Sequence, residues 1–179
     1  MPSFPTMELG EVYFHTASIL NWEYLLKMDK YKKVILDSLN HLSKNGKIKV
    51  YGFVIMPNHI HLIWEMIEKN GKEMPHVSFM KHTAHEFLKD LKTHYPQVLP
   101  RFASNQEDRK YQFWQRNSLP IILYSKKILE QKLDYIHYNP TAGKWNLATD
   151  YVAYYYSSAK FYEEEINDFE FLVDYRERF

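Results

Sequence analysis

Residues 56–64 read Met-Pro-Asn-His-Ile-His-Leu-Ile-Trp, which places His59 and His61 two residues apart inside an apolar run. The valine, isoleucine, phenylalanine and tyrosine residues around this run predict a β-strand. Because a strand turns its side chains to alternate faces, the two histidines are expected to share one face. The residues expected to face a core on the other side are Ile60, Leu62 and Trp64. Two imidazoles on one rigid strand make half of a metal site, although H-x-H alone is also typical of polar positions on a half-buried strand.

Length and composition predict a folded protein. The chain has 179 residues, enough for one domain with a real core. A hydrophobic content of 45% and an aromatic content of 17% exclude a disordered chain, and the lack of cysteine excludes disulfides and thiolate metal sites. The N-terminus lacks a signal-peptide pattern, and no apolar run approaches the ~18 residues of a membrane span. We therefore expect a soluble, cytoplasmic protein with no membrane partner.

Charge is divided unevenly along the chain. Residues 163–179 hold seven acids and two arginines, so subtracting them from the totals of 22 acids and 23 bases leaves 15 acids and 21 bases. Residues 1–162 therefore carry about +6, although the whole chain carries +1. This basic excess permits a nucleic-acid partner. We expect one domain over residues 1–162 and an acidic tail over 163–179, which either packs on the body or mimics the charge of DNA.

The predicted elements follow the order strand, helix, strand, strand, helix, strand. The expected strands are 12–16, 47–56, 59–67 and a fourth within 111–123, and the expected helices are 22–43 and 77–93. This order is the split βαβ, or ferredoxin-like, pattern of an antiparallel sheet. The predicted fold class is therefore α+β, with both helices on one face of the sheet and the other face open to a ligand.

A further helix is predicted from a cap at Ser125 to Pro140. Its apolar stripe consists of Leu129, Leu133 and Ile136. Tyr135 and Asn139, one turn apart, lie on a different side, where they offer a nucleophile and an oxygen ligand for a hard divalent cation. Both also have ordinary explanations, since the chain holds 15 Tyr and asparagine is common at a helix end before proline.

The two motifs together resemble a known family. Residues 56–63, followed from Tyr135 by Tyr-Ile-His-Tyr-Asn-Pro, look like the signature pair of the HUH single-tyrosine transposases, and above all of the REP-associated tyrosine transposases of bacteria. Residues 113–116, Phe-Trp-Gln-Arg, and 156–159, Tyr-Ser-Ser-Ala, resemble further segments in the same order. The resemblance runs from about residue 12 to residue 162, which is most of the chain.

The resemblance implies a metal-dependent DNA transesterase that cleaves and rejoins single-stranded or hairpin DNA in transposition. It makes Tyr135 the nucleophile, which joins the DNA through a 5′-phosphotyrosine. It makes His59, His61 and Asn139 the ligands of one Mg²⁺ or Mn²⁺. The family fold is ferredoxin-like, which agrees with the order of the elements.

The chain departs from the family pattern in two places, which affects substrate choice. Residues 16–18 lack an arginine often found after the first strand, and residues 139–145 lack the usual Val-Arg-Ala run after the proline. Because both changes could alter which DNA is bound, no residue is assigned to DNA contact. The sequence also does not decide between a monomer and a homodimer, or name the hairpin that is cut.

Two other functions stay open from the sequence. One is a non-catalytic module that binds single-stranded nucleic acid on an aromatic sheet face. The other is a metal-dependent phosphodiesterase that uses His59 and His61 with an activated water, with Tyr135 only structural. A covalent protein–DNA adduct separates these functions, since only the transposase forms one.

Overall fold

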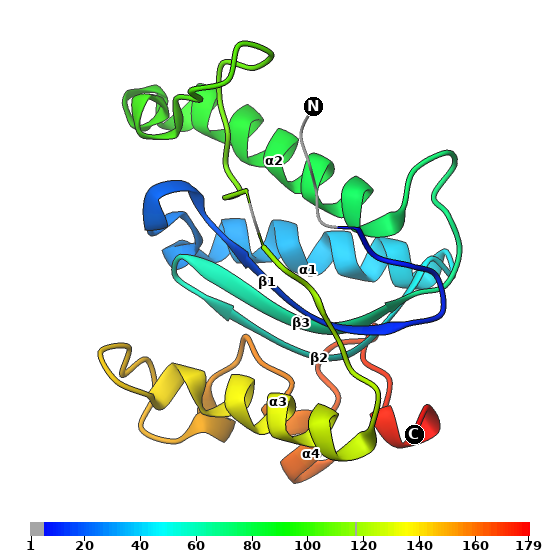
Figure 1. The fold of residues 1–179 in the computed structure, drawn as a ribbon. Helices are drawn as coiled ribbons and strands as arrows, with labels where there is room; N and C mark the ends of the chain where they lie inside the picture. The colour runs from blue at the N-terminus through cyan, green and yellow to red at the C-terminus, as the bar shows by residue number, and fades with distance from the viewer. Residues whose placement is uncertain (1–5, 117) are drawn as a thin grey trace.

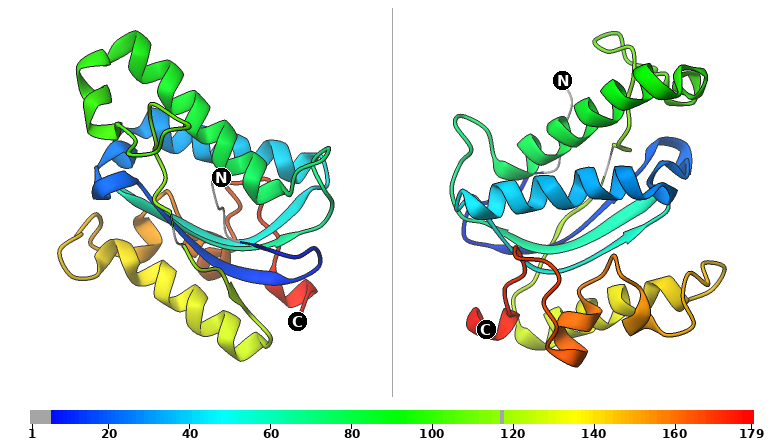
Figure 2. Two further views of the ribbon diagram at one scale, coloured as in Figure 1. Left: turned by 45° about the horizontal axis from the view of Figure 1, so that its top comes forward. Right: turned by 180° about the vertical axis from the view of Figure 1, so that it is seen from behind.

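The computed structural model describes residues 6–116 and 118–179, and in these the chain forms three layers (Figure 1). A four-stranded sheet lies between α1 and α2 on one face and α3 and α4 on the other, as both views in Figure 2 also show. The strands and α-helices are β1 Val12–Ser18, α1 Asp29–Lys44, β2 Ile48–Met56, β3 His59–Met66, α2 Pro75–His94, β4 Ile121–Ile122, α3 Lys126–Tyr138 and α4 Ala159–Glu164. The 3₁₀ turns are η1 Leu20–Trp22, η2 Leu25–Lys27, η3 Pro96–Phe102, η4 Asn139–Thr141, η5 Tyr151–Ala153 and η6 Tyr175–Glu177.

The sheet has the order that the sequence predicts. Its strands run β2-β3-β1-β4 and all pair antiparallel, which is the ferredoxin-like arrangement. The first helix is shorter than predicted, because residues 20–27 form η1 and η2 before α1 begins at Asp29. The fourth strand is reduced to Ile121–Ile122, directly after Pro120. Residues 1–5, where the predicted domain 1–162 begins, and Asn117, within the predicted fourth strand, lie outside the described residues.

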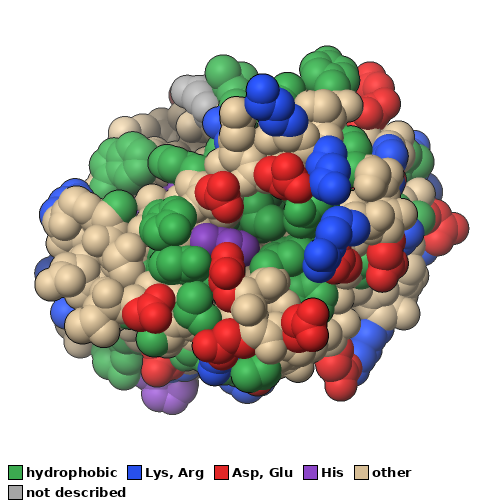
Figure 3. Space-filling model, turned by 90° about the horizontal axis from the view of Figure 1, so that it is seen from below, with side chains coloured by type: hydrophobic (Ala, Val, Ile, Leu, Met, Phe, Trp, Pro, Cys, Tyr) green, Lys and Arg blue, Asp and Glu red, His purple; other side chains and the backbone are tan. Residues whose placement is uncertain are grey.

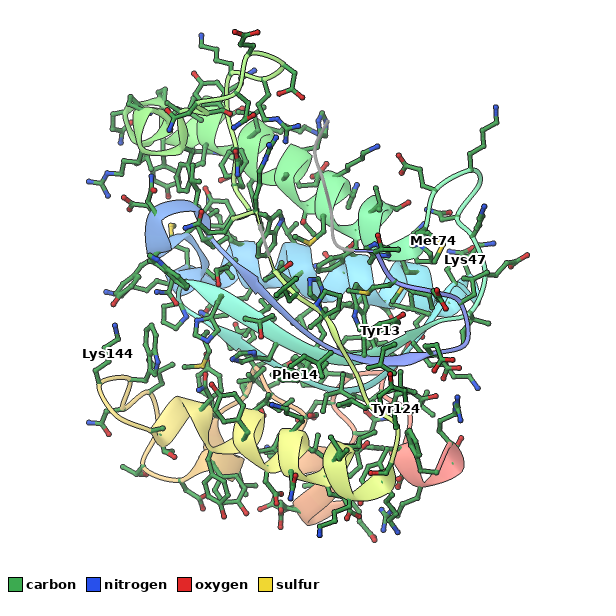
Figure 4. The ribbon with its side chains drawn as sticks, viewed as in Figure 1. Tyr13, Phe14, Lys47, Met74, Tyr124 and Lys144 are labelled. Atoms are coloured by element: carbon green, nitrogen blue, oxygen red, sulfur yellow. The ribbon has the colours of Figure 1, made fainter. Side chains whose placement is uncertain are left out.

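Alternate residues of the central strands fill two separate cores. Ile60, Leu62 and Trp64 of β3 are buried in the core on the α1 and α2 side, as predicted. In β1, Tyr13 belongs to this core and Phe14 to the second core beneath the sheet. Figure 4 shows these two side chains on opposite sides of the β1 ribbon. The histidine face of β3 therefore looks toward the second core.

The prediction that this second face stays open to a ligand is wrong. The helix α3 lies across it and buries the predicted stripe of Leu129, Leu133 and Ile136 against the sheet. Gly52 on β2 permits the close approach, because a Cβ atom at that position would lie 2.5 Å from Cδ1 of Leu133. The order of elements predicts α3 as an additional helix, but it does not predict where that helix docks.

The chain after α3 covers the edge of β2. Backbone hydrogen bonds run from Ile55 N to Tyr156 O at 2.9 Å and from Val173 N to Val50 O at 2.9 Å. Phe169 of the acidic segment is buried and packs edge-on against a phenylalanine of β2. Of the two roles considered for this segment, the structure shows packing on the body, which closes a sheet edge to further strands. In the described residues, no helix has the length and apolar character needed to cross a bilayer.

Candidate active site

The four residues predicted to form the site lie together beneath the start of β3. The rings of His59 and His61 are 4.8 Å apart between centroids, and the ring of Tyr135 is 5.6 Å from that of His61. His59 Nε2 lies 3.3 Å from Asn139 Oδ1, although the two residues are 80 positions apart in the chain. Tyr135 is 53% exposed, so its ring is reachable from solvent at the mouth of the site.

Local signals on α3 place Tyr135 and Asn139. The Ser125 side chain accepts a hydrogen bond from Ile128 N and so begins the helix, as the sequence predicts. Asn139 keeps helical backbone angles before Pro140, which sets it one turn beyond Tyr135. The intervening His137 points elsewhere, because its Nε2 shares a 2.8 Å hydrogen bond with Ser158 in the buried layer behind the helix.

The Nδ1 atoms of both histidines are held by neighbours. His61 Nδ1 shares a 2.7 Å hydrogen bond with the Thr16 hydroxyl, and Thr16 stands directly opposite His61 in the pairing of β1 with β3. Acceptor oxygens lie beside both ring nitrogens of His59: Asn58 Oδ1 is 2.7 Å from Nδ1 and Asn139 Oδ1 is 3.3 Å from Nε2. The shorter contact favours the proton on Nδ1. These contacts leave the two Nε2 atoms as the free ligand positions.

The donor atoms fit a divalent cation. Burial lowers the pKa of His59, and it lowers the pKa of His61 to about 3, so both imidazoles are neutral, as ligation requires. His61 Nε2 is buried with no hydrogen-bond partner in the described residues, and the lone pair of His59 Nε2 faces the Asn139 oxygen. Within residues 6–116 and 118–179, no group of three His, Cys, Asp or Glu could hold a metal. A cation bound by the two histidines would have the Asn139 amide oxygen, 3.3 Å from His59 Nε2, as its third protein ligand.

Aromatic rings and one lysine surround the histidines. Phe14 stacks on His61 with centroids 5.4 Å apart, and Lys132 Nζ lies 4.8 Å above the Phe14 ring. Trp145, from the loop after α3, lies 5.8 Å from the His59 ring. The sequence pattern alone does not identify these residues or the partner role of Thr16. The register of β1 against β3 is the signal that identifies Thr16 and Phe14, and it appears only in the folded sheet.

Known proteins resemble this chain in sequence and in fold. No family model matches the chain. A protein of Haemophilus influenzae described as a REP-associated tyrosine transposase is 26% identical over 139 residues, covering 73% of this chain and 70% of that protein. The chain is related to the REP-associated tyrosine transposases. The family resemblance predicted from the two motifs is therefore confirmed.

The present chain also resembles a solved structure over nearly its whole fold. The structure of a REP-associated tyrosine transposase bound to a REP hairpin matches with a TM-score of 0.62 at 15% identity. The match covers 97% of this chain and 98% of the other. At this level of identity the match shows a common fold.

Charge on the surface of the present protein is not uniform. Figure 3 looks onto the side of α3 and α4 and shows Asp and Glu side chains spread over much of that face, with Lys and Arg mainly toward one side. Glu163 and Glu164 at the end of α4, and Glu165 after it, are all exposed. A DNA backbone would be repelled from most of this face.

Proposed function

We propose that this chain cleaves and rejoins single-stranded or hairpin DNA by transesterification, with Tyr135 as the nucleophile. The observation that carries the proposal is the convergence of an exposed tyrosine with two neutral histidines and an amide oxygen, whose free atoms suit Mg²⁺ or Mn²⁺. The relation to the REP-associated tyrosine transposases supports a role of this kind, and the hairpin bound by the solved relative supports a hairpin substrate.

In the proposed reaction, the Tyr135 phenol oxygen attacks the phosphorus of a DNA phosphodiester. The bond from phosphorus to the 3′ oxygen breaks, the 5′ phosphate stays on Tyr135, and the phenol proton is transferred, through solvent, to the 3′ oxygen. A divalent cation at the histidines would offset the phosphate charge and orient the group for attack. Rejoining is the reverse attack by the 3′-OH, which needs no ATP because the phosphotyrosine ester retains the reactivity of the original bond.

The chain's own side chains prepare this attack. Thr16 and Asn58 fix the two imidazole rings, so the Nε2 atoms are positioned before DNA arrives. Phe14 and Trp145 cover the rings and limit the access of water. Lys132 places a positive charge beside the same aromatic wall, where it would attract the backbone of a bound strand.

The test is a covalent-adduct assay with a labelled hairpin and Mn²⁺. Tyr135→Phe removes one hydroxyl and keeps the ring, so we expect normal folding and DNA binding but no label on denatured protein. Tyr138→Phe is a matched control, because Tyr138 lies on the same helix and is 52% exposed, yet stacks on Tyr151 outside the site. This control is expected to form the adduct at the wild-type rate.

Each other outcome points to a different function. Label trapped by Tyr135→Phe would identify another nucleophile and refute the assignment. Cut DNA with no trapped label in the wild type would favour the phosphodiesterase. Binding with neither cutting nor label would favour the non-catalytic module.

A further inference from the structure

The segment after β1 holds a tryptophan in an unfavourable backbone conformation. Asn21 and Trp22 have φ of 54° and 56°, in the left-handed region that residues other than glycine rarely occupy. The turn is tied to the site through Asn58, whose side chain donates to Trp22 O at 3.5 Å and whose backbone oxygen accepts from Ile19 N at 2.8 Å. The result is an indole that is 58% exposed. A strained turn that presents a large apolar ring to water is typical of a ligand contact.

One face of this turn borders a polar cavity of about 500 Å³. The residues that line it are Thr16, Ser18, Trp22, Gln115, Arg116, Ser118 and Leu119. Thr16 is also the partner of His61 Nδ1, so the Thr16 side chain and the His61 ring lie between the cavity and the proposed metal position at Nε2. The volume lies within the ~300–1,000 Å³ of pockets that hold small ligands.

Arg116 is the one basic residue among the described residues that line this cavity. Its Nε atom is buried without a hydrogen-bond partner, and no carboxylate forms an ion pair with it in the described part of the chain. The backbone beside it is fixed, because Gln115 N donates to Ser18 O at 2.7 Å. A guanidinium without a carboxylate, next to hydroxyl and amide groups, suits a phosphate.

A second cavity on the other side of Trp22 is less suited to DNA. It measures about 460 Å³, and its lining includes Tyr24, Met28 and Tyr95. Its one arginine, Arg101, is paired with Glu23 at 3.7 Å. A phosphate group would therefore be attracted to the cavity that Arg116 lines.

We infer that the cavity beside Trp22 is a subsite for one unpaired nucleotide next to the cleaved phosphodiester, with its base stacked on Trp22 and its phosphate against Arg116. Stacking on an aromatic ring combined with a backbone contact is the usual way in which proteins hold single strands. The inference rests on the proposed function, because it places the cleaved strand at Tyr135. It also fits the surface charge, since the described residues that line this cavity include no acid and none from α4.

The test compares two DNA probes on full-length protein carrying Tyr135→Phe, so that no cutting occurs. One probe is a hairpin with a four-nucleotide single-stranded flank, and the other is the same hairpin with blunt ends. We expect Trp22→Ala to weaken binding of the flanked probe about 10-fold, in line with the loss of one stacked base. Arg116→Gln should weaken it and lower the log–log salt slope by about 0.7. Neither change should alter affinity for the blunt probe.

Matched controls separate the subsite from general effects. Tyr124→Ala removes a ring that is 77% exposed at the start of α3, the end of that helix away from Lys144 in Figure 4. Lys127→Ala removes one exposed positive charge from the same helix. Both should leave binding unchanged. Trp22→Phe keeps a stacking ring and should recover most of the affinity that Trp22→Ala loses, which excludes misfolding as the cause.

The subsite is refuted if Trp22→Ala and Arg116→Gln weaken both probes equally, or neither. That result would leave the proposed function standing, provided that the wild type still forms the covalent adduct. If binding of the flanked probe depends on Trp22 but the wild type forms no covalent adduct, the subsite is supported and the assignment of Tyr135 as the nucleophile is refuted.

Discussion

At the scale of single residues, Thr16 is the side chain on which the orientation of His61 depends. Its hydroxyl lies 2.7 Å from His61 Nδ1, so the ring is fixed with Nε2 left free. Partners of this kind, which bond the second nitrogen of a ligating histidine, commonly affect metal affinity by 10–100-fold.

Thr16→Val removes this hydroxyl and keeps the shape of the side chain. We expect Mn²⁺ affinity, measured by calorimetry, to fall about 10–100-fold while the thermal unfolding midpoint changes little. Thr16→Ser keeps the hydroxyl and should bind Mn²⁺ like the wild type. The double change His59→Ala and His61→Ala should abolish binding, and unchanged affinity in that variant would contradict the whole metal site.

At the scale of elements, the docking of α3 on β2 decides where the nucleophile sits. Leu133 and Ile136 flank Tyr135 along the helix and reach the sheet where Gly52 leaves space. A side chain at Gly52 would crowd Leu133 and Ile136, and any outward shift of the helix that follows would carry Tyr135 away from His61.

Gly52→Ala would place a methyl group 2.5 Å from Leu133 Cδ1, a contact that is relieved only if the Leu133 side chain or the helix shifts. We expect a loss of about 1–3 kcal/mol in the free energy of unfolding, measured in urea. The adduct rate should fall by up to about 100-fold, because a 1 Å displacement of a reacting group can cost that much. Adding Leu133→Val, which lacks the Cδ1 atom, should restore part of both losses. A Gly52→Ala protein with wild-type stability would show that the helix does not depend on this close contact.

At the scale of the whole molecule, burial of histidine makes stability depend on pH. His15 is fully buried against Trp64, with ring centroids 5.7 Å apart, and burial lowers its pKa to about 3. The unfolded chain would protonate it near pH 6.5. Because the folded pKa is the lower one, its contribution to stability is complete above pH 6.5 and is lost as the pH falls toward 3.

Urea unfolding between pH 7.5 and pH 4.5, without divalent cations, measures this effect. His15 alone should reduce the free energy of unfolding by about 1.4 kcal/mol for each pH unit below its unfolded pKa. His15→Leu should remove that part of the slope. His85→Gln, at an exposed position on α2, should leave the slope unchanged. Parallel curves for wild type and His15→Leu would show that His15 is not kept neutral by the fold.

Features that depend on local periodicity could be predicted from the amino-acid sequence. Alternation along a strand placed His59 and His61 on one face, and the helical repeat kept Tyr135 off the apolar stripe of α3. The order of the strands and helices predicted the ferredoxin-like sheet, which the structure confirms. The bounds 1–162 and 163–179, the metal and the roles of the site residues stay predictions.

Contacts between residues far apart in the chain could not be predicted and become visible in the folded protein. The register of β1 placed Thr16 opposite His61, and the docking of α3 over the predicted open face brought Asn139 within 3.3 Å of His59. Trp22 and Arg116 line one cavity because residues 113–116 pair with the end of β1 and the turn after it. The physical reason is the same in each case: strand register and helix docking are set by long-range packing, which the local pattern of residues does not contain.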